Sequence, residues 1–103
     1  MPRQKPMVHD WEEFGEEIYE KVGEALDYFC WNVTGDTPLD CYIAHMDRDL
    51  YDLAEEFADW SHFGITEKDI ELLREMPDDV FRKYTNKMQR AIEKVVRELE
   101  REL

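Results

Sequence analysis

The sequence of 103 residues is poor in helix-breaking residues, since it contains only 4 Gly and 4 Pro. So few turn-forming residues exclude a fold of many short strands and favour helices joined by short loops. No β-type alternation of apolar and polar residues bounded by turns occurs along the chain. A hydrophobic fraction of 43% and an aromatic fraction of 13% predict a packed core rather than a disordered acidic tail.

Long apolar runs are also missing. No segment approaches the roughly 20 apolar residues that a membrane-spanning helix needs, and residues 1–9 lack the apolar stretch of a signal peptide. The chain has only 2 cysteines, Cys30 and Cys41. Without a secretion signal, the sequence predicts reduced thiols and a cytoplasmic location.

Basic residues are scarce, because 13 Lys and Arg stand against 26 Asp and Glu, for a formal net charge of -13. Nucleic acid and anionic membrane surfaces repel a chain of this charge. The sequence therefore excludes an ordinary nucleic-acid-binding protein and predicts no membrane contact. The natural complement is the basic surface of another protein.

Familiar catalytic motifs are missing too: there is no Gly-rich phosphate loop, no Gly-x-Ser-x-Gly and no His-Glu-x-x-His. Acid pairs such as Glu13/Glu16 and Asp49/Asp52 resemble the magnesium-binding pairs of all-α nucleotide pyrophosphohydrolases. Their spacing does not reproduce that family's arrangement cleanly. We therefore predict that the protein is not an enzyme, and keep a Mg-dependent pyrophosphohydrolase as a further alternative.

What the sequence does contain is strong helical periodicity with clear start and stop residues. Asp10 and Glu13 predict a capping box at the start of the first helix. Thr37 is expected to cap a second helix that has Pro38 at its first position, and Gly64 is expected to end that helix. The predicted elements are a flexible N-terminal tail at 1–9 and helices at 10–31, 38–63, 66–76 and 78–103. The predicted fold class is all-α: a small helical bundle of three long helices and one short helix, in a single domain at 10–103.

Charge is unevenly distributed. Residues 7–79 hold 22 acids and 4 bases, whereas residues 80–103 hold 7 bases and 4 acids. Solvated helix faces usually interleave the two signs, because like charges four residues apart repel by a few tenths of a kcal/mol. Rows of uncompensated carboxylates on the first two helices therefore indicate a functional cause. The first acidic ridge is Glu13, Glu16, Glu20, Glu24 and Asp27, with Glu17 beside it, and the second acidic ridge is Asp49, Asp52, Glu56 and Asp59.

Eight carboxylates between Asp10 and Asp27 occupy roughly 26 Å of helix. That is about one per 3 Å, near the roughly 3.4 Å spacing of phosphates along one DNA strand. This charge geometry is similar in kind to that of phage-type DNA mimics, acidic helical proteins that occupy the nucleic-acid grooves of restriction or CRISPR-type nucleases. The likeness implies an inhibitor that mimics DNA or RNA and binds a nuclease or other nucleic-acid-binding protein through both ridges.

The main alternative is a helical adaptor or regulatory subunit that binds a protein partner through an apolar face. Tyr19 and Tyr51 lie beside acids, outside the main apolar stripes, and could dock onto an arginine-rich surface by cation–π contacts. Under the mimicry hypothesis, the last helix is a scaffold or the seam of a homodimer. The residues of that seam would be Met88, Ile92, Val95 and Leu99.

One group of residues could bind a metal. Cys41 and His45 stand four residues apart, so a helix would place both on one face as zinc ligands. Cys30 could join them if the first two helices are antiparallel, and His62 is a more distant candidate. Small core cysteines and a half-buried histidine are the commoner outcome, so the sequence predicts no metal and no cofactor, with zinc as the alternative.

Overall fold

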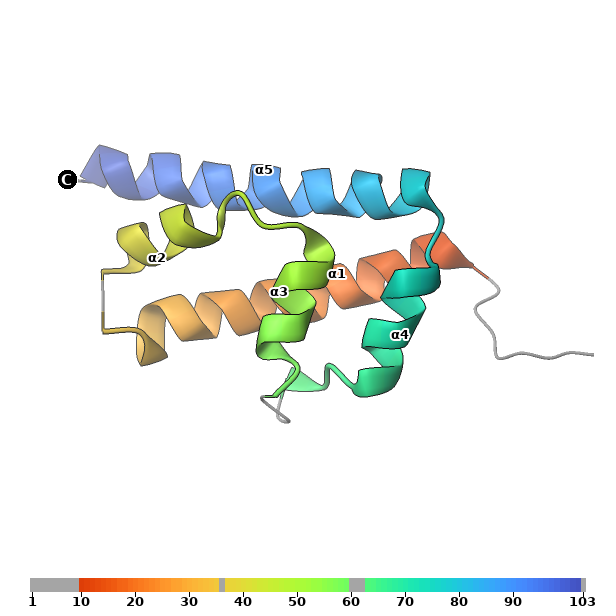
Figure 1. Cartoon of the computed structure of the whole chain (residues 1–103). Coiled ribbons are helices and arrows are strands. Elements are labelled where there is room, and N and C mark those ends of the chain that lie inside the picture. Colours follow the sequence, from red (N-terminus) through yellow and green to blue (C-terminus); the bar gives the residue numbers. More distant parts are fainter. Residues whose placement is uncertain (1–9, 36, 60–62, 103) are drawn as a thin grey trace, which may run out of the picture.

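The computed structural model describes residues 10–35, 37–59 and 63–102, so the predicted tail at 1–9 lies outside the described residues. Within these ranges the protein is an all-α bundle without strands, as predicted. The elements are α1 (Trp11–Tyr28), the π-helical turn η1 (Phe29–Val33), α2 (Pro38–His45), α3 (Leu50–Phe57), α4 (Glu67–Glu75) and α5 (Asp78–Glu102). In Figure 1, α1 and α5 run in the same direction, with α2 returning beside their C-terminal halves and α3 crossing α1.

Polar side chains cap α1, α2 and α4 (Glu67–Glu75) at the residues that the sequence predicts. The Asp10 carboxylate accepts hydrogen bonds from the amides of Glu12 and Glu13, which start α1. The Thr37 hydroxyl does the same for α2. Among the described helix starts, only Thr66 and Asp69 of α4 form the reciprocal capping box. The predicted box at Asp10 is therefore a one-way cap.

The predicted second long helix is wrong, because the chain leaves the helical path after His45 and enters a new helix at Leu50. Asp49 caps the new helix by accepting a 2.8 Å hydrogen bond from the amide of Asp52. The Leu50 amide donates to the Thr85 hydroxyl of α5 over 3.2 Å. The break lets α2 lie along α5 while α3 turns across α1 (Figure 1). The bundle therefore has two long helices and three short ones.

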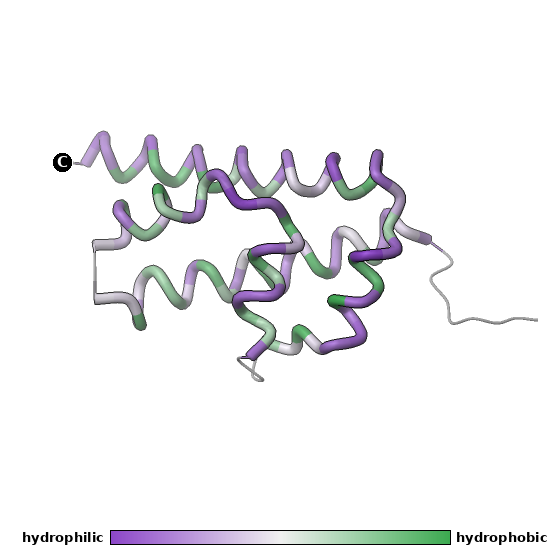
Figure 2. The backbone as a smooth tube through the Cα atoms, viewed as in Figure 1, coloured by the Kyte–Doolittle hydropathy of each residue, from purple (hydrophilic) through white to green (hydrophobic). Residues whose placement is uncertain are grey.

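The core lies between α1, α3 and α5. Figure 2 shows α5 apolar on the side that faces α1 and α2 and polar on the opposite side. On α1 the buried side chains at 1% exposure or less are Ile18, Val22, Ala25 and Leu26. Their partners on the other elements include Tyr42, Leu50, Leu53, Phe57, Met88 and Ile92. Helix α1 therefore buries one face and leaves the opposite face to solvent.

A close approach fixes how α1 and α5 pair. A Cβ atom on Gly15 would lie 2.5 Å from ring carbons of Tyr84, so only glycine leaves room for that ring. The Tyr84 hydroxyl donates a 3.0 Å hydrogen bond to the Glu12 carbonyl oxygen. Burial raises the pKa of Tyr84, which keeps this hydroxyl a donor. Together these contacts set the register of the two parallel helices.

Candidate functional site

The outward face of α1 is a row of exposed carboxylates. These residues, named here the α1 stripe, are Glu13, Glu17, Glu20, Glu24 and Asp27. They are exposed because the apolar positions between them turn into the core. The stripe covers about 21 Å with about 5 Å between successive carboxylates. This spacing is wider than the phosphate spacing of roughly 3.4 Å, so the linear density estimated from all eight acids does not hold for the stripe.

The remaining acids of α1 face α5 and are compensated there. Lys87 pairs with Glu16 at 2.7 Å, and Lys83 pairs with Glu12. The hydrogen bond to Glu16 raises the pKa of Lys87, and the bond to Glu12 raises that of Lys83. Glu16 was predicted to contact a partner, and the structure places it in this internal pair instead.

The α1 stripe itself has almost no compensation. Across the described parts of the chain, no ion pair or side-chain hydrogen bond is formed by Glu13, Glu17, Glu20 or Glu24. Asp27 accepts a 2.6 Å hydrogen bond from the Tyr42 hydroxyl of α2. Burial of Tyr42, together with this bond, raises its pKa strongly. The Tyr42 hydroxyl therefore stays protonated and holds the Asp27 carboxylate in place.

A groove runs beside the stripe, between α1 and α5. Its volume is about 300 Å³, and its surface is mostly apolar. Glu20, Glu24 and Asp27 form the rim on the α1 side. No lysine or arginine lines this groove among the described residues. The lining residues are Tyr19, Glu20, Gly23, Glu24, Leu26, Asp27, Tyr42, Met88, Ala91, Ile92 and Val95.

The second acidic ridge lies on the other side of the molecule. Leu50, Leu53 and Phe57 of α3 are buried and pack toward the apolar face of α1. The exposed acids of α3, Asp52 and Glu55, must therefore point away from α1, as the α1 stripe points away from α3. Asp59 is exposed just beyond the end of α3. The two ridges do not make one continuous face.

Two further acids of the second ridge have internal roles. Asp49 is the N-cap of α3. Glu56 pairs with Arg48 at 2.7 Å and with the His45 ring at 3.2 Å. Only Asp52 and Asp59 of this ridge keep exposed carboxylates without a partner in the described structure.

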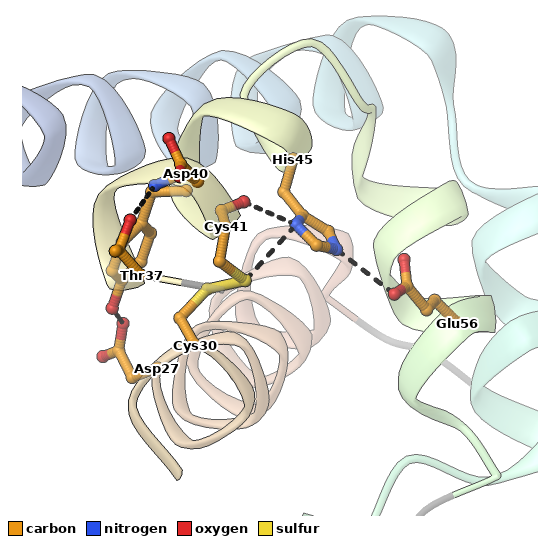
Figure 3. Close-up of a disulfide and its surroundings, with 8 residues drawn as sticks. Asp27, Cys30, Thr37, Asp40, Cys41, His45 and Glu56 are labelled. Carbon is orange, nitrogen blue, oxygen red and sulfur yellow. Dashed lines mark hydrogen bonds and ion pairs between the residues drawn. A yellow bond between two sulfur atoms is a disulfide. The ribbon is translucent and has the colours of Figure 1, made fainter. Parts of the chain in front are cut away.

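The three candidate metal ligands come together. Cys30 of η1 and Cys41 of α2 form a disulfide, with Cα atoms 5.5 Å apart, so the prediction of reduced thiols is wrong for this structure. His45 lies one helical turn after Cys41 and points at the sulfur atoms (Figure 3). The antiparallel arrangement of α1 and α2, which the sequence argument required, is present (Figure 1). His62 lies outside the described residues.

The predicted aromatic anchors are engaged inside the chain. The Lys87 ammonium lies 4.6 Å from the ring centre of Tyr19, and the Arg74 guanidinium lies 5.6 Å from that of Tyr51. Large apolar side chains that are exposed lie at one end of the bundle, on the last residue of α1, on η1 and on α2. They are Trp31 at 56%, Tyr28 at 45%, Ile43 at 43% and Val33 at 41% exposure. The exposed apolar residues of η1 and α2 follow no helical periodicity in the sequence. Their exposure is therefore apparent only from the packing of the folded chain.

The residues predicted for a homodimer seam are divided between core and surface. Met88 and Ile92 are buried at 2% exposure, so they pack inside this chain. Val95 and Leu99 are partly buried against the core. Only the second pair keeps area for a partner.

Comparisons place no known protein beside this one: no family model, no curated protein and no solved structure matches the chain. Among the described residues, no helix combines the length and the apolar character needed to cross a bilayer.

Proposed function

We propose that this protein is an acidic binding protein, without catalytic activity, that acts as a nucleic-acid mimic. Its α1 stripe and the adjoining groove would engage the basic surface of a nuclease or other nucleic-acid-binding protein and exclude the nucleic acid. One observation carries the proposal. Carboxylates without a basic partner form the rim of an apolar groove, and no lysine or arginine of the described residues lines that groove.

The distribution of bases on α5 supports this choice of surface. Lys83 and Lys87 compensate the α5-facing acids at the start of α1. Farther along, α5 presents Ala91, Ile92 and Val95 to the groove instead of basic residues. Lys21, the one base of α1, pairs with Asp69 of α4 at 3.5 Å rather than with the stripe. No ion pair in the described structure therefore relieves the repulsion among Glu17, Glu20 and Glu24. A partner that supplies cations would relieve it.

The chemistry of the groove fits arginine and lysine side chains. Their aliphatic stems prefer apolar surface while their charged ends need a counter-charge. An arginine whose stem lies over Ile92 and Val95 would bring its guanidinium to the rim at Glu20 or Glu24. Such contacts would give fast, salt-sensitive association, because opposite charges steer the encounter. Direct binding of nucleic acid or of an anionic membrane stays disfavoured by the net charge of -13.

The decisive experiment compares two variants of equal charge. In the stripe variant Glu17, Glu20 and Glu24 become lysine, and in the control variant Asp52, Glu55 and Asp59 become lysine. Each protein is immobilised and incubated with cell extract at low and high salt, and the eluted protein is identified. The purified partner is then tested for nucleic-acid binding in the presence of each variant.

We expect the wild type and the control to block nucleic-acid binding, and the stripe variant to lose at least 100-fold in inhibition. Equal inhibition by both variants would remove the α1 stripe from the mechanism. A partner whose nucleic-acid binding is unaffected by the wild type would refute mimicry. Salt-insensitive capture would point to the apolar alternative.

The second candidate function is a helical adaptor that binds through an apolar face. It is favoured by a hollow of about 470 Å³ between the start of α2 and the end of α5, where Trp31, Leu39 and Leu99 meet. Single exposed apolar residues are ordinary, whereas a contiguous patch marks an interaction surface. Trp31→Ser with Ile43→Ser should abolish partner capture in this case and leave it unchanged under mimicry. Sedimentation of the same variants would also test a homodimer that uses Leu99.

The protein is proposed to act in the cytoplasm. Disulfides there are uncommon and are usually redox-responsive. The Cys30–Cys41 bond would then exchange with a dithiol form under cellular reductants.

A further inference from the structure

The most concentrated group of metal-ligating atoms in the described residues lies in the core, behind the C-terminal end of the α1 stripe, where Asp27 lies one helical turn before Cys30 (Figure 3). The sulfur atoms of Cys30 and Cys41 and a ring nitrogen of His45 all lie within 4.8 Å of one another. All three residues are buried, at 1%, 3% and 6% exposure. Figure 3 shows them converging from η1 and from one face of α2.

The separations suit a tetrahedral ion. With Zn–S bonds of about 2.3 Å and Zn–N bonds of about 2.0–2.1 Å, neighbouring ligand atoms stand about 3.5–3.8 Å apart. The distance from Cys41 Sγ to His45 Nδ1 is 3.8 Å. The backbones of Cys30 and Cys41 are already adjacent, with Cα atoms 5.5 Å apart. Side-chain rotations would therefore be enough to place the two sulfurs and the nitrogen around one ion.

The opposite nitrogen of the same ring has the partner that a metal-bound histidine usually has. His45 Nε2 lies 3.2 Å from Glu56 Oε2 of α3. A carboxylate that accepts the second N–H of a ligating imidazole fixes its orientation and raises its basicity. Arg48 holds the other oxygen of Glu56 at 2.7 Å. The contact with Glu56 on the Nε2 side therefore fixes the orientation of the His45 ring, and Nδ1 faces Cys41.

We propose that the reduced protein binds one Zn²⁺ ion through Cys30 Sγ, Cys41 Sγ and His45 Nδ1, and that the disulfide is the metal-free state of the same site. The site uses none of the carboxylates of the proposed partner surface. Glu56 is a positioning residue for it. The described residues bring no fourth Cys, His, Asp or Glu into the group, so a water molecule completes the tetrahedron.

The exchange between the two states is chemically balanced. A cellular dithiol reductant donates two electrons and two protons to the Cys30–Cys41 bond, which becomes two thiols while the reductant becomes a disulfide. Zn²⁺ then replaces the two thiol protons, which pass to solvent. It binds His45 Nδ1, with the ring proton on Nε2 toward Glu56, in place of the contact of that nitrogen with the Cys41 carbonyl oxygen, 2.8 Å away. A disulfide oxidant that accepts two electrons from the two thiolates and two protons from solvent becomes a dithiol, while the Cys30–Cys41 bond re-forms and the ion is released.

A purely structural disulfide does not account for the surroundings. It would need no imidazole beside it and no carboxylate behind that imidazole. Burying His45 and half-burying Glu56 as a pair costs desolvation free energy that an apolar pair would avoid. A metal-binding role explains why these residue types occupy these positions.

The test uses the full chain after reduction with a phosphine, which does not itself supply thiols. Zinc content is measured after gel filtration, and Co²⁺ is used as a spectroscopic probe of tetrahedral thiolate ligation. We expect one zinc per reduced chain, thiolate-to-cobalt charge-transfer absorption, and less than a tenth of this uptake by the oxidised chain.

Matched variants separate the site from the exposed acids. Cys30→Ser and His45→Asn should each abolish the charge-transfer band or weaken metal binding at least 100-fold. Glu56→Gln should weaken it about 10–100-fold, while Glu55→Gln, on the exposed side of α3, should leave it unchanged. Circular dichroism of each variant reports whether the helices persist.

Three results would overturn the proposal. The first is a folded, reduced chain that takes up no zinc or cobalt. The second is uptake that survives oxidation or the Cys30→Ser change, which would place the ion on surface carboxylates. The third is a reduced chain that unfolds and is not refolded by zinc.

Discussion

The backbone amide of Leu50 donates a hydrogen bond of 3.2 Å to the hydroxyl of Thr85, which lies 35 residues later in the chain. Leu50 is completely buried and Thr85 is 9% exposed, so water cannot replace this bond. The contact fixes the first turn of α3 on α5. It also accounts for the helix break before Leu50, because the amide would otherwise pair within one continuous helix.

Replacing Thr85 by valine should destabilise the protein by about 1–3 kcal/mol, since the change keeps the shape but leaves the buried Leu50 amide without an acceptor. Thr85→Ser retains the hydroxyl and should recover most of that loss. Urea unfolding followed by circular dichroism measures both. Equal midpoints for the two variants would show that the hydroxyl is not required.

The two glycines of α1 that face α5 should respond to alanine in opposite directions. At Gly15 the new methyl group meets the Tyr84 ring at 2.5 Å, and overpacking of this kind costs about 1–3 kcal/mol. At Gly23 the nearest atom is Met88 Cε at 3.9 Å, so Gly23→Ala should gain up to about 1 kcal/mol of helix propensity. Thermal melts of the pair provide the comparison. A Gly15→Ala variant as stable as the wild type would refute the close α1–α5 packing.

Stability should fall at alkaline pH partly because of Tyr42. Burial and the bond to Asp27 raise the pKa of this tyrosine above its ordinary value of 10.0. The folded protein then keeps a proton that the unfolded chain loses, so the stabilisation is complete below about pH 10 and declines as pH rises further. Tyr42→Phe should cost about 1 kcal/mol at neutral pH and lose less on going to about pH 11. The free energies of unfolding of the wild type and of Tyr42→Phe are measured across this pH range. If both fell equally above about pH 10, Tyr42 would not be the cause of the alkaline loss of stability.

Salt should raise the melting temperature. The α1 stripe repels itself, and at about 0.15 M ionic strength the screening length is about 8 Å, comparable to its spacing. Changing Glu17, Glu20 and Glu24 to glutamine should raise the melting temperature in low salt and reduce its salt dependence. Calorimetry of both proteins across a sodium chloride series tests this. A flat wild-type response would mean that repulsion within the stripe is negligible.

Periodicity and capping predicted the all-α fold because both act over a few neighbouring residues. Thr37, Asp10 and Thr66 cap helices as their sequence neighbours indicate. The break between α2 and α3 could not be predicted so directly. Asp49 is a good N-cap, but its use depends on Thr85, which is remote in sequence.

The candidate site was predicted in part. The amphipathic pattern of α1 correctly gives the exposure of Glu13, Glu17 and Glu20. It cannot distinguish these from Glu16, because pairing with Lys87 depends on how α5 is placed. Asp49 and Glu56 make internal contacts that the sequence did not predict, for the same reason. The groove has no counterpart in local sequence, since its two walls come from opposite ends of the chain.

The parallel pairing of α1 with α5 also affects how the protein is made. Glu12 and Lys83 meet across 71 residues, so α1 is synthesised well before the helix that covers it. At translation rates of about 5–20 residues per second, the stretch from Tyr28 to Glu102 takes roughly 4–15 s to synthesise. Throughout that interval Ile18 and Val22 are exposed to other hydrophobic chains. The dense carboxylates on the opposite face would keep neighbouring nascent copies apart, so the α1 stripe would also protect the chain from aggregation before folding is complete.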